Sequence, residues 1–394
     1  MNILYIWDSD YPWDVRVEKI CSTLSSNGHQ VHIAARNLKK LPLYEVRDNL
    51  IIHRLKLWQN DKLNYTLSFP AFFSPVWSHF INEIIRCNGI DLIIVRDLPM
   101  AIAGIWAGRR NKIPVIFDMA EDYVAMIWDI WRARKFQGFN LVVRNPYLAK
   151  LVERYAFRNS DHILVVIDEA RDLVINRGAL PDKVTIVCNT PVLDVFNQED
   201  VVLNETADRI ESRYAMVYVG GIQMGRGIQV VFEAIPYIIR EIPDFLFVII
   251  GDGYATQRLK DMAVSMGIQD YVLWLGWIEH GAIFTYLKSC KVGVIPHKVT
   301  DHINTTIPNK IFDYMGLGLP VLAADALPMK RIIQAEKCGE IFKSGISRDL
   351  AANLIKIYKS SQNYGMHGKC SVENQYNWNI DSSRLISAIL KVHK

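Results

Sequence analysis

Short apolar runs alternate with amphipathic stretches along nearly the whole chain, and this alternation strongly constrains its fold. Short apolar runs bounded by turn signals are typical of buried strands, whereas an apolar side chain every three to four residues is typical of a helix. Helical patterns include Val15–Ser26, Met100–Arg110 and Tyr147–Phe157. The strands predicted in the first half are Asn2–Trp7, Gln30–Ala35, Asp91–Val95, Val115–Phe117, His162–Val166 and Val184–Val187, with Ile51–Leu57 as a further candidate. This series predicts a doubly wound parallel sheet.

A second series of the same kind begins at Ala215, after a turn-like acidic stretch from Asn189 to about Ile210 that we interpret as a linker. Glycines recur at or just after the ends of its strands, where open parallel sheets bind ligands and where glycine lets the backbone approach a phosphate. Glycine is also common in loops, so only this systematic placement favours a binding role. The predicted strands are Ala215–Val219, Phe245–Ile250, Val272–Leu275, Val292–Ile295 and Pro320–Ala323.

The chain is therefore predicted to be an α/β protein with two Rossmann-like domains that face each other across a cleft. We place the N-terminal domain at residues 1–195 and the second at 196–375. A last helix, at 376–394, is expected to pack on the N-terminal domain. A length of 394 residues fits two domains, because single cores seldom grow beyond about 250–300 residues.

The composition narrows the class of function. A net charge of only +4 excludes the strongly basic surface that nucleic-acid binding requires, so we expect no nucleic-acid partner. The six cysteines show neither CxxC spacing nor clustering with histidine, which argues against a zinc site or a disulfide framework and favours a reducing cytoplasm. The opening segment Met1–Asp8 has no basic region and is interpreted as a strand, so neither a signal peptide nor a transmembrane helix is expected.

The stretch Val217–Ile228 combines a strand, a glycine turn, one arginine, a further glycine and the start of a helix. Backbone N–H groups at a helix entrance, together with the Arg226 guanidinium, suit a diphosphate. Taken alone this signal is weak, because a loop arginine is more often simply solvated.

A more specific pattern follows the predicted strand Val292–Ile295. Pro308 suits the first position of a helix, with Thr305 or Thr306 as its cap. The amide groups at such a helix start favour phosphate. Asp313 would lie about one and a half turns inside that helix, where its carboxylate can accept two hydrogen bonds from ribose hydroxyls.

The block Pro308–Val321 resembles the "PNK-F-EYM-x-x-G-x-PV" block of the family 4 glycosyltransferases, which are retaining enzymes of the GT-B fold. This subgroup is typical of bacterial surface polysaccharide biosynthesis. Two earlier blocks agree, because Asp14–Val31 is similar to "D-x-RV … L-x-x-x-GH-x-V" and Asp118–Glu121 is similar to "D-x-HE". The segments 161–163, 187–191 and 374–378 also resemble the family, in the same order along the chain.

The resemblance implies roles residue by residue. Arg226 would hold the donor diphosphate and Asp313 the ribose, while Ile278, just after a strand, either flanks the base or packs in the core. Asp118 and Glu121 would be the catalytic residues facing the sugar and the acceptor. The donor site would comprise Gly220, Gly221, Arg226, Gly251, Ile278, Thr305, Thr306, Asn309, Lys310 and Asp313, and the acceptor side Asp14, Arg16 and Asp97.

Three positions depart from the family pattern. Gly221 stands where an arginine is common, Ala120 replaces the "D-x-HE" histidine, and Thr305 replaces the first acid of "E-x7-E". We predict that Lys310 partly replaces the missing cation. The departures keep open the alternative of a non-catalytic pseudo-glycosyltransferase that binds nucleotide sugar. A sugar-nucleotide epimerase is a second alternative, because it shares the double-Rossmann fold.

The expected activity is transfer of a sugar from a nucleoside diphosphate sugar to a hydroxyl of a glycan or polyprenyl-linked acceptor, in assembly of O-antigen, capsule or exopolysaccharide. Neither a cofactor nor a metal is expected, since cations and helix amides can neutralise the leaving group. Asp8-Ser9-Asp10 resembles a DxD metal motif but directly follows the first strand, so we interpret it as a polar loop.

The segment Met126–Phe139 is the candidate for contact with an anionic membrane. It sets Trp128 and Trp131 beside Arg132, Arg134 and Lys135, and rings beside cations suit the lipid headgroup layer. A buried helix face or a dimer contact is the alternative. The expected location is the cytoplasm, with peripheral binding to the inner face of the plasma membrane.

Overall fold

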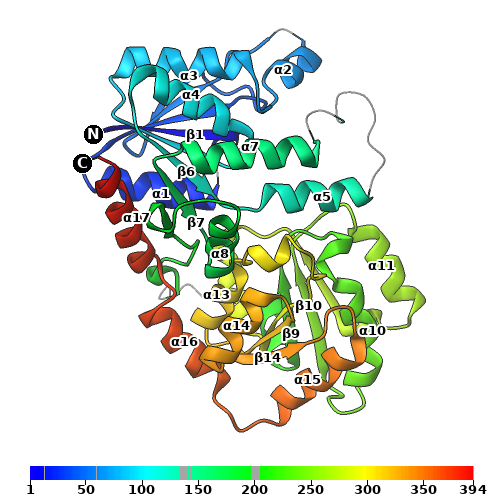
Figure 1. The fold of residues 1–394 in the computed structure, drawn as a ribbon. Helices are drawn as coiled ribbons and strands as arrows, with labels where there is room; N and C mark the ends of the chain where they lie inside the picture. Colours follow the sequence, from blue (N-terminus) through cyan, green and yellow to red (C-terminus); the bar gives the residue numbers. More distant parts are fainter. Residues whose placement is uncertain (13, 59, 134–140, 142–143, 197–204, 394) are drawn as a thin grey trace. The chain divides into compact units, whose positions relative to one another are not determined.

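The structure, a computed structural model, describes residues 1–12, 14–58, 60–133, 141, 144–196 and 205–393. The chain divides into two compact units, one made of Met1–Asn189 with Asp381–Lys394 and the other of Thr190–Ile380. Each unit holds one sheet with helices on both faces (Figure 1). The predicted α/β fold is therefore confirmed. No helix in the described ranges is both long and apolar enough to cross a bilayer.

The sheet of the first unit follows the order β3-β4-β2-β1-β5-β6-β7-β8. Its strands run parallel except β3, which pairs antiparallel with β4 at the edge. The central β1 is apolar because Ile3 to Ile6 are fully buried on both faces. The strands are β1 (Asn2–Asp10), β2 (Gln30–Arg36), β3 (Tyr44–Arg47), β4 (Leu50–Arg54), β5 (Leu92–Arg96), β6 (Val115–Met119), β7 (His162–Val165) and β8 (Val184–Ile186).

The interpretation of Asp8-Ser9-Asp10 as a loop is wrong. These residues continue β1, because the pairing with β2 resumes at Asp10 opposite Arg36 after an irregularity that follows Ile6. The Asp10 carboxylate then accepts hydrogen bonds from the backbone N–H groups of Leu38 and Lys39.

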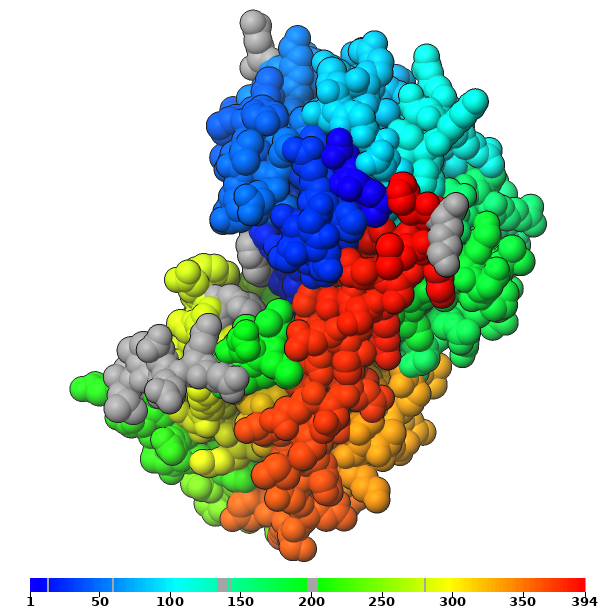
Figure 2. Space-filling view, turned by 90° about the vertical axis from the view of Figure 1, so that its left-hand side faces the viewer, coloured from blue at the N-terminus to red at the C-terminus, as the bar shows by residue number. Residues whose placement is uncertain are grey.

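Helices cover both faces of this first sheet. Figure 1 shows α3, α4 and α7 on one face and α1 on the other. From Asp381 on, α17 belongs to this unit, and Figures 1 and 2 both show it beside the blue N-terminal segment. The helices are α1 (Val15–Ser26), α2 (Asp61–Leu67), α3 (Pro75–Asn88), α4 (Ala101–Asn111), α5 (Tyr123–Ala133), α7 (Pro146–Asn159), α8 (Asp168–Asn176) and α17 (Trp378–Val392).

The second sheet is parallel throughout, in the order β11-β10-β9-β12-β13-β14. Its strands are β9 (Tyr214–Val219), β10 (Phe245–Ile250), β11 (Val272–Gly276), β12 (Val292–Ile295), β13 (Val321–Ala324) and β14 (Gly339–Phe342). The helices of this unit are α9 (Glu205–Glu211), α10 (Ile228–Ile238), α11 (Thr256–Ser265), α12 (His280–Lys288), α13 (Lys310–Gly316), α14 (Leu327–Glu336), α15 (Ser347–Lys359) and α16 (Tyr364–Asn374).

Each sheet reverses its strand order beside its first strand, between β1 and β5 in one unit and between β9 and β12 in the other. In α/β proteins, the loops after the two strands at such a reversal lead to opposite faces of the sheet. Ligands bind between these loops, outside the carboxyl ends of the strands. The functional side chains of each unit are therefore expected at the carboxyl ends of these two strand pairs.

Candidate functional site

Two glycines let the loops after β9 and β10 touch. A Cβ atom on Gly251 would lie 2.1 Å from the Gly220 carbonyl oxygen, and both residues have φ values, +131° and +134°, that favour glycine. The Gly220 N–H donates to the Ile250 carbonyl at 2.9 Å. The end of β11 lies beside these loops, because the Gly251 N–H donates to the Gly276 carbonyl at 2.7 Å. Ile278, two residues after Gly276, is half-buried.

Lys310, the first residue of α13, reaches the glycine loop after β9. Its Nζ atom lies 2.9 Å from the place that a Gly220 Cβ would occupy and 4.1 Å from the centroid of the Tyr218 ring. Burial first and the charge of Arg226 second lower the pKa of Lys310 to about 7, against the opposing effect of Asp313. Within the described ranges, the ammonium forms no ion pair with a carboxylate.

Arg226 lies on a short 3-10 turn, Met224–Arg226, that packs against the residues just after β12. A Cβ on Gly227 would lie 1.7 Å from the Pro296 carbonyl oxygen, and the Lys298 N–H donates to the Gly225 carbonyl at 3.1 Å. The side chain is partly exposed and, among the residues described, makes no ion pair. Arg226 and Lys310 therefore supply two positive groups near the carboxyl ends of β9 and β12.

The predicted start of the helix at Pro308 is wrong. α13 begins at Lys310, and the side chain of its N-cap residue, Asn309, makes no capping hydrogen bond. Thr305 ends a 3-10 turn, where its hydroxyl donates to the His302 carbonyl at 3.0 Å instead of capping α13, and Thr306 is extended. Asp313 consequently lies in the first turn, partly buried and close enough to Lys310 to raise its pKa.

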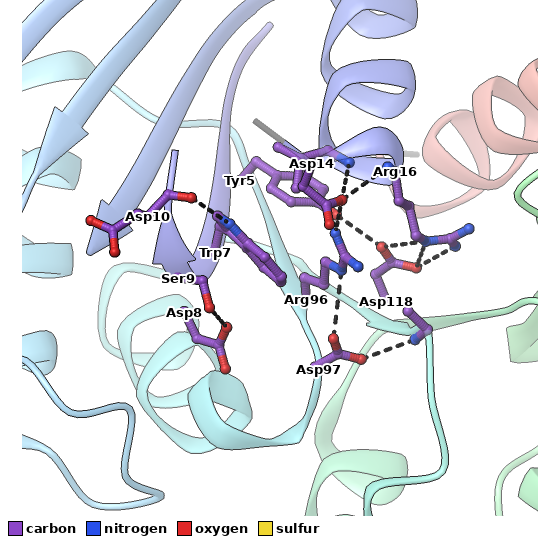
Figure 3. Close-up of polar contacts among 12 residues, drawn as sticks. Tyr5, Trp7, Asp8, Ser9, Asp10, Asp14, Arg16, Arg96, Asp97 and Asp118 are labelled. Carbon is purple, nitrogen blue, oxygen red and sulfur yellow. Dashed lines mark hydrogen bonds and ion pairs between the residues drawn. The ribbon is translucent and has the colours of Figure 1, made fainter. Parts of the chain in front are cut away.

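Asp118, on β6 of the first unit, is fully buried in an ion pair with Arg16 of α1 (Figure 3). Arg16 Nη2 lies 2.5 Å from Asp118 Oδ1, Arg16 Nε lies 3.0 Å from Oδ2, and the Tyr5 hydroxyl donates to Oδ2 at 2.9 Å. Arg16 also donates to the Val187 carbonyl at 2.9 Å. The pair thereby links α1, β1, β6 and the chain after β8.

Asp14 and Arg96 form a second ion pair near the carboxyl ends of β1 and β5 (Figure 3). The Asp14 carboxylate caps α1 by accepting from the N–H groups of Arg16 and Val17. The Arg96 guanidinium lies 4.1 Å from the centroid of the Trp7 ring. Asp14 thus holds Arg96 in place at the end of β5.

Asp97 is an acid of this unit with a strained backbone conformation. It is buried and combines φ of 61° with ψ of 167°, a region that side chains other than glycine rarely adopt. Its carboxylate accepts from the Ala120 N–H at 3.1 Å and lies 3.5 Å from Arg96 Nε. Burial raises the pKa of Asp97 well above its usual value; Arg96 opposes the shift, and Glu121, Asp8 and Asp118 add to it. Glu121, which is exposed, therefore lies near this group.

The structure groups the predicted residues by unit. It brings Gly220, Arg226, Gly251, Lys310 and Asp313 to the edge after β9, and Asp14, Arg16, Asp97, Asp118 and Glu121 to the edge after β1 and β5. Sequence reasoning left out Arg96 and Tyr218. A charged residue that ends an apolar strand, as in Leu92–Arg96, is the signal that points to Arg96.

The comparisons with known proteins agree with this geometry. Residues 14–190 match the family model described as "Glycosyl transferase 4-like domain", and residues 213–360 match the model described as "Glycosyl transferases group 1". The solved structure of the Anabaena protein HepE with UDP-glucose is similar at TM-score 0.74 and 14% identity, covering 99% of this chain and 100% of that chain.

Two curated relatives are matched over part of their length. The alpha-D-kanosaminyltransferase of Streptomyces kanamyceticus is 26% identical over 48% of this chain and 48% of its own length. The alpha-monoglucosyldiacylglycerol synthase of Streptococcus pneumoniae is 22% identical over 72% of this chain and 63% of its own length. Because the two family models together match most of the chain, in the order of the two sheets, the chain belongs to the group 1, or family 4, glycosyltransferases of the GT-B fold.

Proposed function

We propose that the chain is a retaining glycosyltransferase that moves a sugar from a nucleoside diphosphate sugar to a hydroxyl of a glycan or lipid-linked acceptor in surface polysaccharide assembly. The observation that carries the proposal is the pair Lys310 and Arg226 beside a glycine-lined backbone at the carboxyl end of β9. Two positive groups without carboxylate partners in the described residues suit a diphosphate. HepE, a protein of the same fold, holds UDP-glucose.

The residues of the second unit act on the leaving group. Negative charge accumulates on the diphosphate as the bond to the sugar breaks, and preorganised cations stabilise it without reorganising solvent. Lys310 would face this charge over Gly220, and Arg226 would face it from the 3-10 turn. Asp313, on the same helix as Lys310, remains our candidate for the ribose hydroxyls. Retention of configuration rests on the family resemblance.

The residues of the first unit divide into positioning groups and candidate contacts. Asp118 is fully buried and bonded to Arg16 and Tyr5, so we assign it a positioning role in place of direct contact with substrate. Glu121 is exposed and Asp97 lies beside it, so these two are the candidates that face the sugar or the acceptor. Asp14 acts through Arg96, which it holds at the end of β5.

A thermal-shift screen with UDP-, GDP-, ADP- and dTDP-sugars tests the donor. A ligand at 100 times its Kd adds about 2.7 kcal/mol of stability, so we expect one nucleotide series to raise the Tm clearly. Radiolabelled donor and candidate acceptors then test transfer. Absence of any shift would contradict the proposal, binding without turnover would favour the pseudo-glycosyltransferase, and free epimerised nucleotide sugar would favour the epimerase.

We propose that the contact with an anionic membrane also includes α7. Residues Arg134–Phe139 of the segment proposed from the sequence lie outside the described residues. Its described part adjoins α7, because the Trp128 ring lies 5.3 Å from the ring of Tyr147. On α7, the exposed cations Lys150, Arg154 and Arg158 follow one another at every fourth position. Such a row places its charges along one side of the helix.

A row of apolar side chains runs beside these cations on α7. Tyr147 and Leu151 are 67% and 62% exposed, and the next residue of the row, Tyr155, accepts a hydrogen bond from Trp106 Nε1 of α4 at 3.0 Å. Exposed rings and aliphatic chains beside cations match the headgroup layer of an anionic bilayer. The relative from Streptococcus pneumoniae is a synthase of a glucosyl lipid, which agrees with a lipid-linked acceptor.

Reversing the charges of Lys150, Arg154 and Arg158 to glutamate is expected to remove most co-sedimentation with phosphatidylglycerol vesicles, because each cation near an anionic surface contributes about 1 kcal/mol. The triple variant Arg86→Glu, Arg258→Glu, Lys369→Glu is the matched control, since it changes exposed cations elsewhere by the same net charge. Equal loss in both variants, or none in the first, would argue against the α7 surface.

A further inference from the structure

His297 is a buried imidazole that lacks hydrogen-bond partners. It lies two residues after the end of β12, where the strand order of the second sheet reverses, and is only 1% exposed. Neither Nδ1 nor Nε2 has a partner among the residues that the structure describes. Buried polar side chains nearly always bond to protein, water or ligand. Two unsatisfied nitrogens at a ligand-binding edge therefore indicate a group that arrives with the ligand.

The surroundings of His297 indicate the charge of that group. Burial lowers the pKa of His297 well below its usual value, and Lys310 and then Arg226 lower it further. The ring is thus neutral, with one N–H donor and one acceptor nitrogen. Because both charged neighbours that act on it are cations, an anion is the ligand that would be attracted to this position.

We propose that His297 is a further donor-binding residue, whose ring N–H donates a hydrogen bond to a phosphate oxygen of the donor diphosphate held by Lys310 and Arg226. This inference rests on the proposed nucleotide-sugar site. It deepens that site by adding a neutral donor next to β12, where the turn Gly225–Gly227 packs against the backbone of Pro296 and Lys298. Three side chains from three segments would then surround the diphosphate.

The substitution His297→Phe separates a binding role from a structural one. A phenyl ring has a similar shape and removes both unsatisfied nitrogens, so the Tm of the ligand-free protein is expected to stay the same or rise. Affinity for inorganic pyrophosphate, measured by calorimetry on the full chain, is expected to fall about tenfold to a hundredfold, as for loss of a hydrogen bond to a charged group. A histidine that only supports the fold would give the opposite pattern, a lower Tm with pyrophosphate affinity retained.

Two further variants make the result decisive. His297→Asn keeps a neutral N–H donor and is expected to retain more pyrophosphate affinity than His297→Phe. Lys310→Ala is expected to lose affinity whether or not His297 takes part. Wild-type affinity in His297→Phe, with loss in Lys310→Ala, would overturn the role of His297 and leave the donor site standing. If the wild type binds neither pyrophosphate nor any nucleoside diphosphate, both the proposed function and this inference fail.

Discussion

Replacement of Asp118 by alanine is expected to lower the free energy of unfolding of its unit by about 3–5 kcal/mol, because removal of one partner leaves a buried charge uncompensated. The guanidinium of Arg16 is 2% exposed and has Asp118 as its bidentate partner. Tyr5 would lose the acceptor for its buried hydroxyl as well. Hydrogen exchange of peptides from β6 and α1, combined with urea unfolding, measures the loss in this unit.

Two controls separate burial from charge in this experiment. Lys40→Ala breaks an ion pair whose side chains are 59% and 78% exposed, and it should change stability by less than about 1 kcal/mol. The double variant Arg16→Met, Asp118→Leu removes both buried charges and should recover much of the loss. If Asp118→Ala keeps wild-type stability but loses transfer activity, Asp118 contacts substrate, as the family resemblance first implied.

Lys310→Ala is expected to weaken binding of the nucleoside diphosphate on the order of tenfold to a hundredfold, since it removes a charge-assisted hydrogen bond in a desolvated place. The ammonium lies 2.9 Å from the place that a Gly220 Cβ would occupy, so a side chain at position 220 would crowd it. Calorimetry with the nucleotide identified by thermal shift provides the measurement. Lys330→Ala, which removes an exposed lysine of α14, is the matched control and should bind as the wild type does.

The same residue gives binding a pH dependence. In the free protein the pKa of Lys310 is about 7, below the usual 10.5, and a bound diphosphate raises it by favouring the charged form. For a nucleoside diphosphate sugar, whose diphosphate has no terminal phosphate to titrate, affinity should therefore be constant below pH 7 and fall by about tenfold per pH unit above it, until the pKa of the complex is reached. Lys310→Arg, which stays charged, should flatten the profile. A wild-type profile that is flat from pH 7 to 9 would contradict the role of Lys310.

The sequence predicted strands where burial leaves a continuous apolar run. The predicted bounds of β10 match those observed, and β1 begins where predicted but runs three residues further, to Asp10. The sequence missed β3, since Tyr44, Val46 and Arg47 are exposed and the segment has no apolar run. β14 was missed for a related reason, because only its last residue, Phe342, is fully buried. Short edge strands owe their structure to the neighbouring strand, which local patterning does not reveal.

Site residues that belong to a local sequence motif could be predicted. Site residues whose environment depends on contacts between distant parts of the chain could not. The strand-glycine-arginine pattern located Arg226 without tertiary information. The ion pair of Arg16 with Asp118 joins residues 102 positions apart, so the burial of Asp118 had no sequence signal. The start of α13 was misplaced because the Thr305 hydroxyl bonds to the preceding turn, and side-chain bonds of this kind compete with helix capping.

The strand order has a consequence for how these enzymes can change. Most residues of both candidate sites lie on or just after inner strands, β1, β5 and β6 in one sheet and β9, β10 and β12 in the other, whereas β3, β8, β11 and β14 form the outer borders. Border strands unfold locally, and their backbone amides exchange hydrogen with solvent, more readily than central strands do. Partial unfolding at a border therefore leaves the reacting groups assembled. Insertions and substitutions at the borders can therefore accumulate at little cost to chemistry. Diversification of acceptors would begin there.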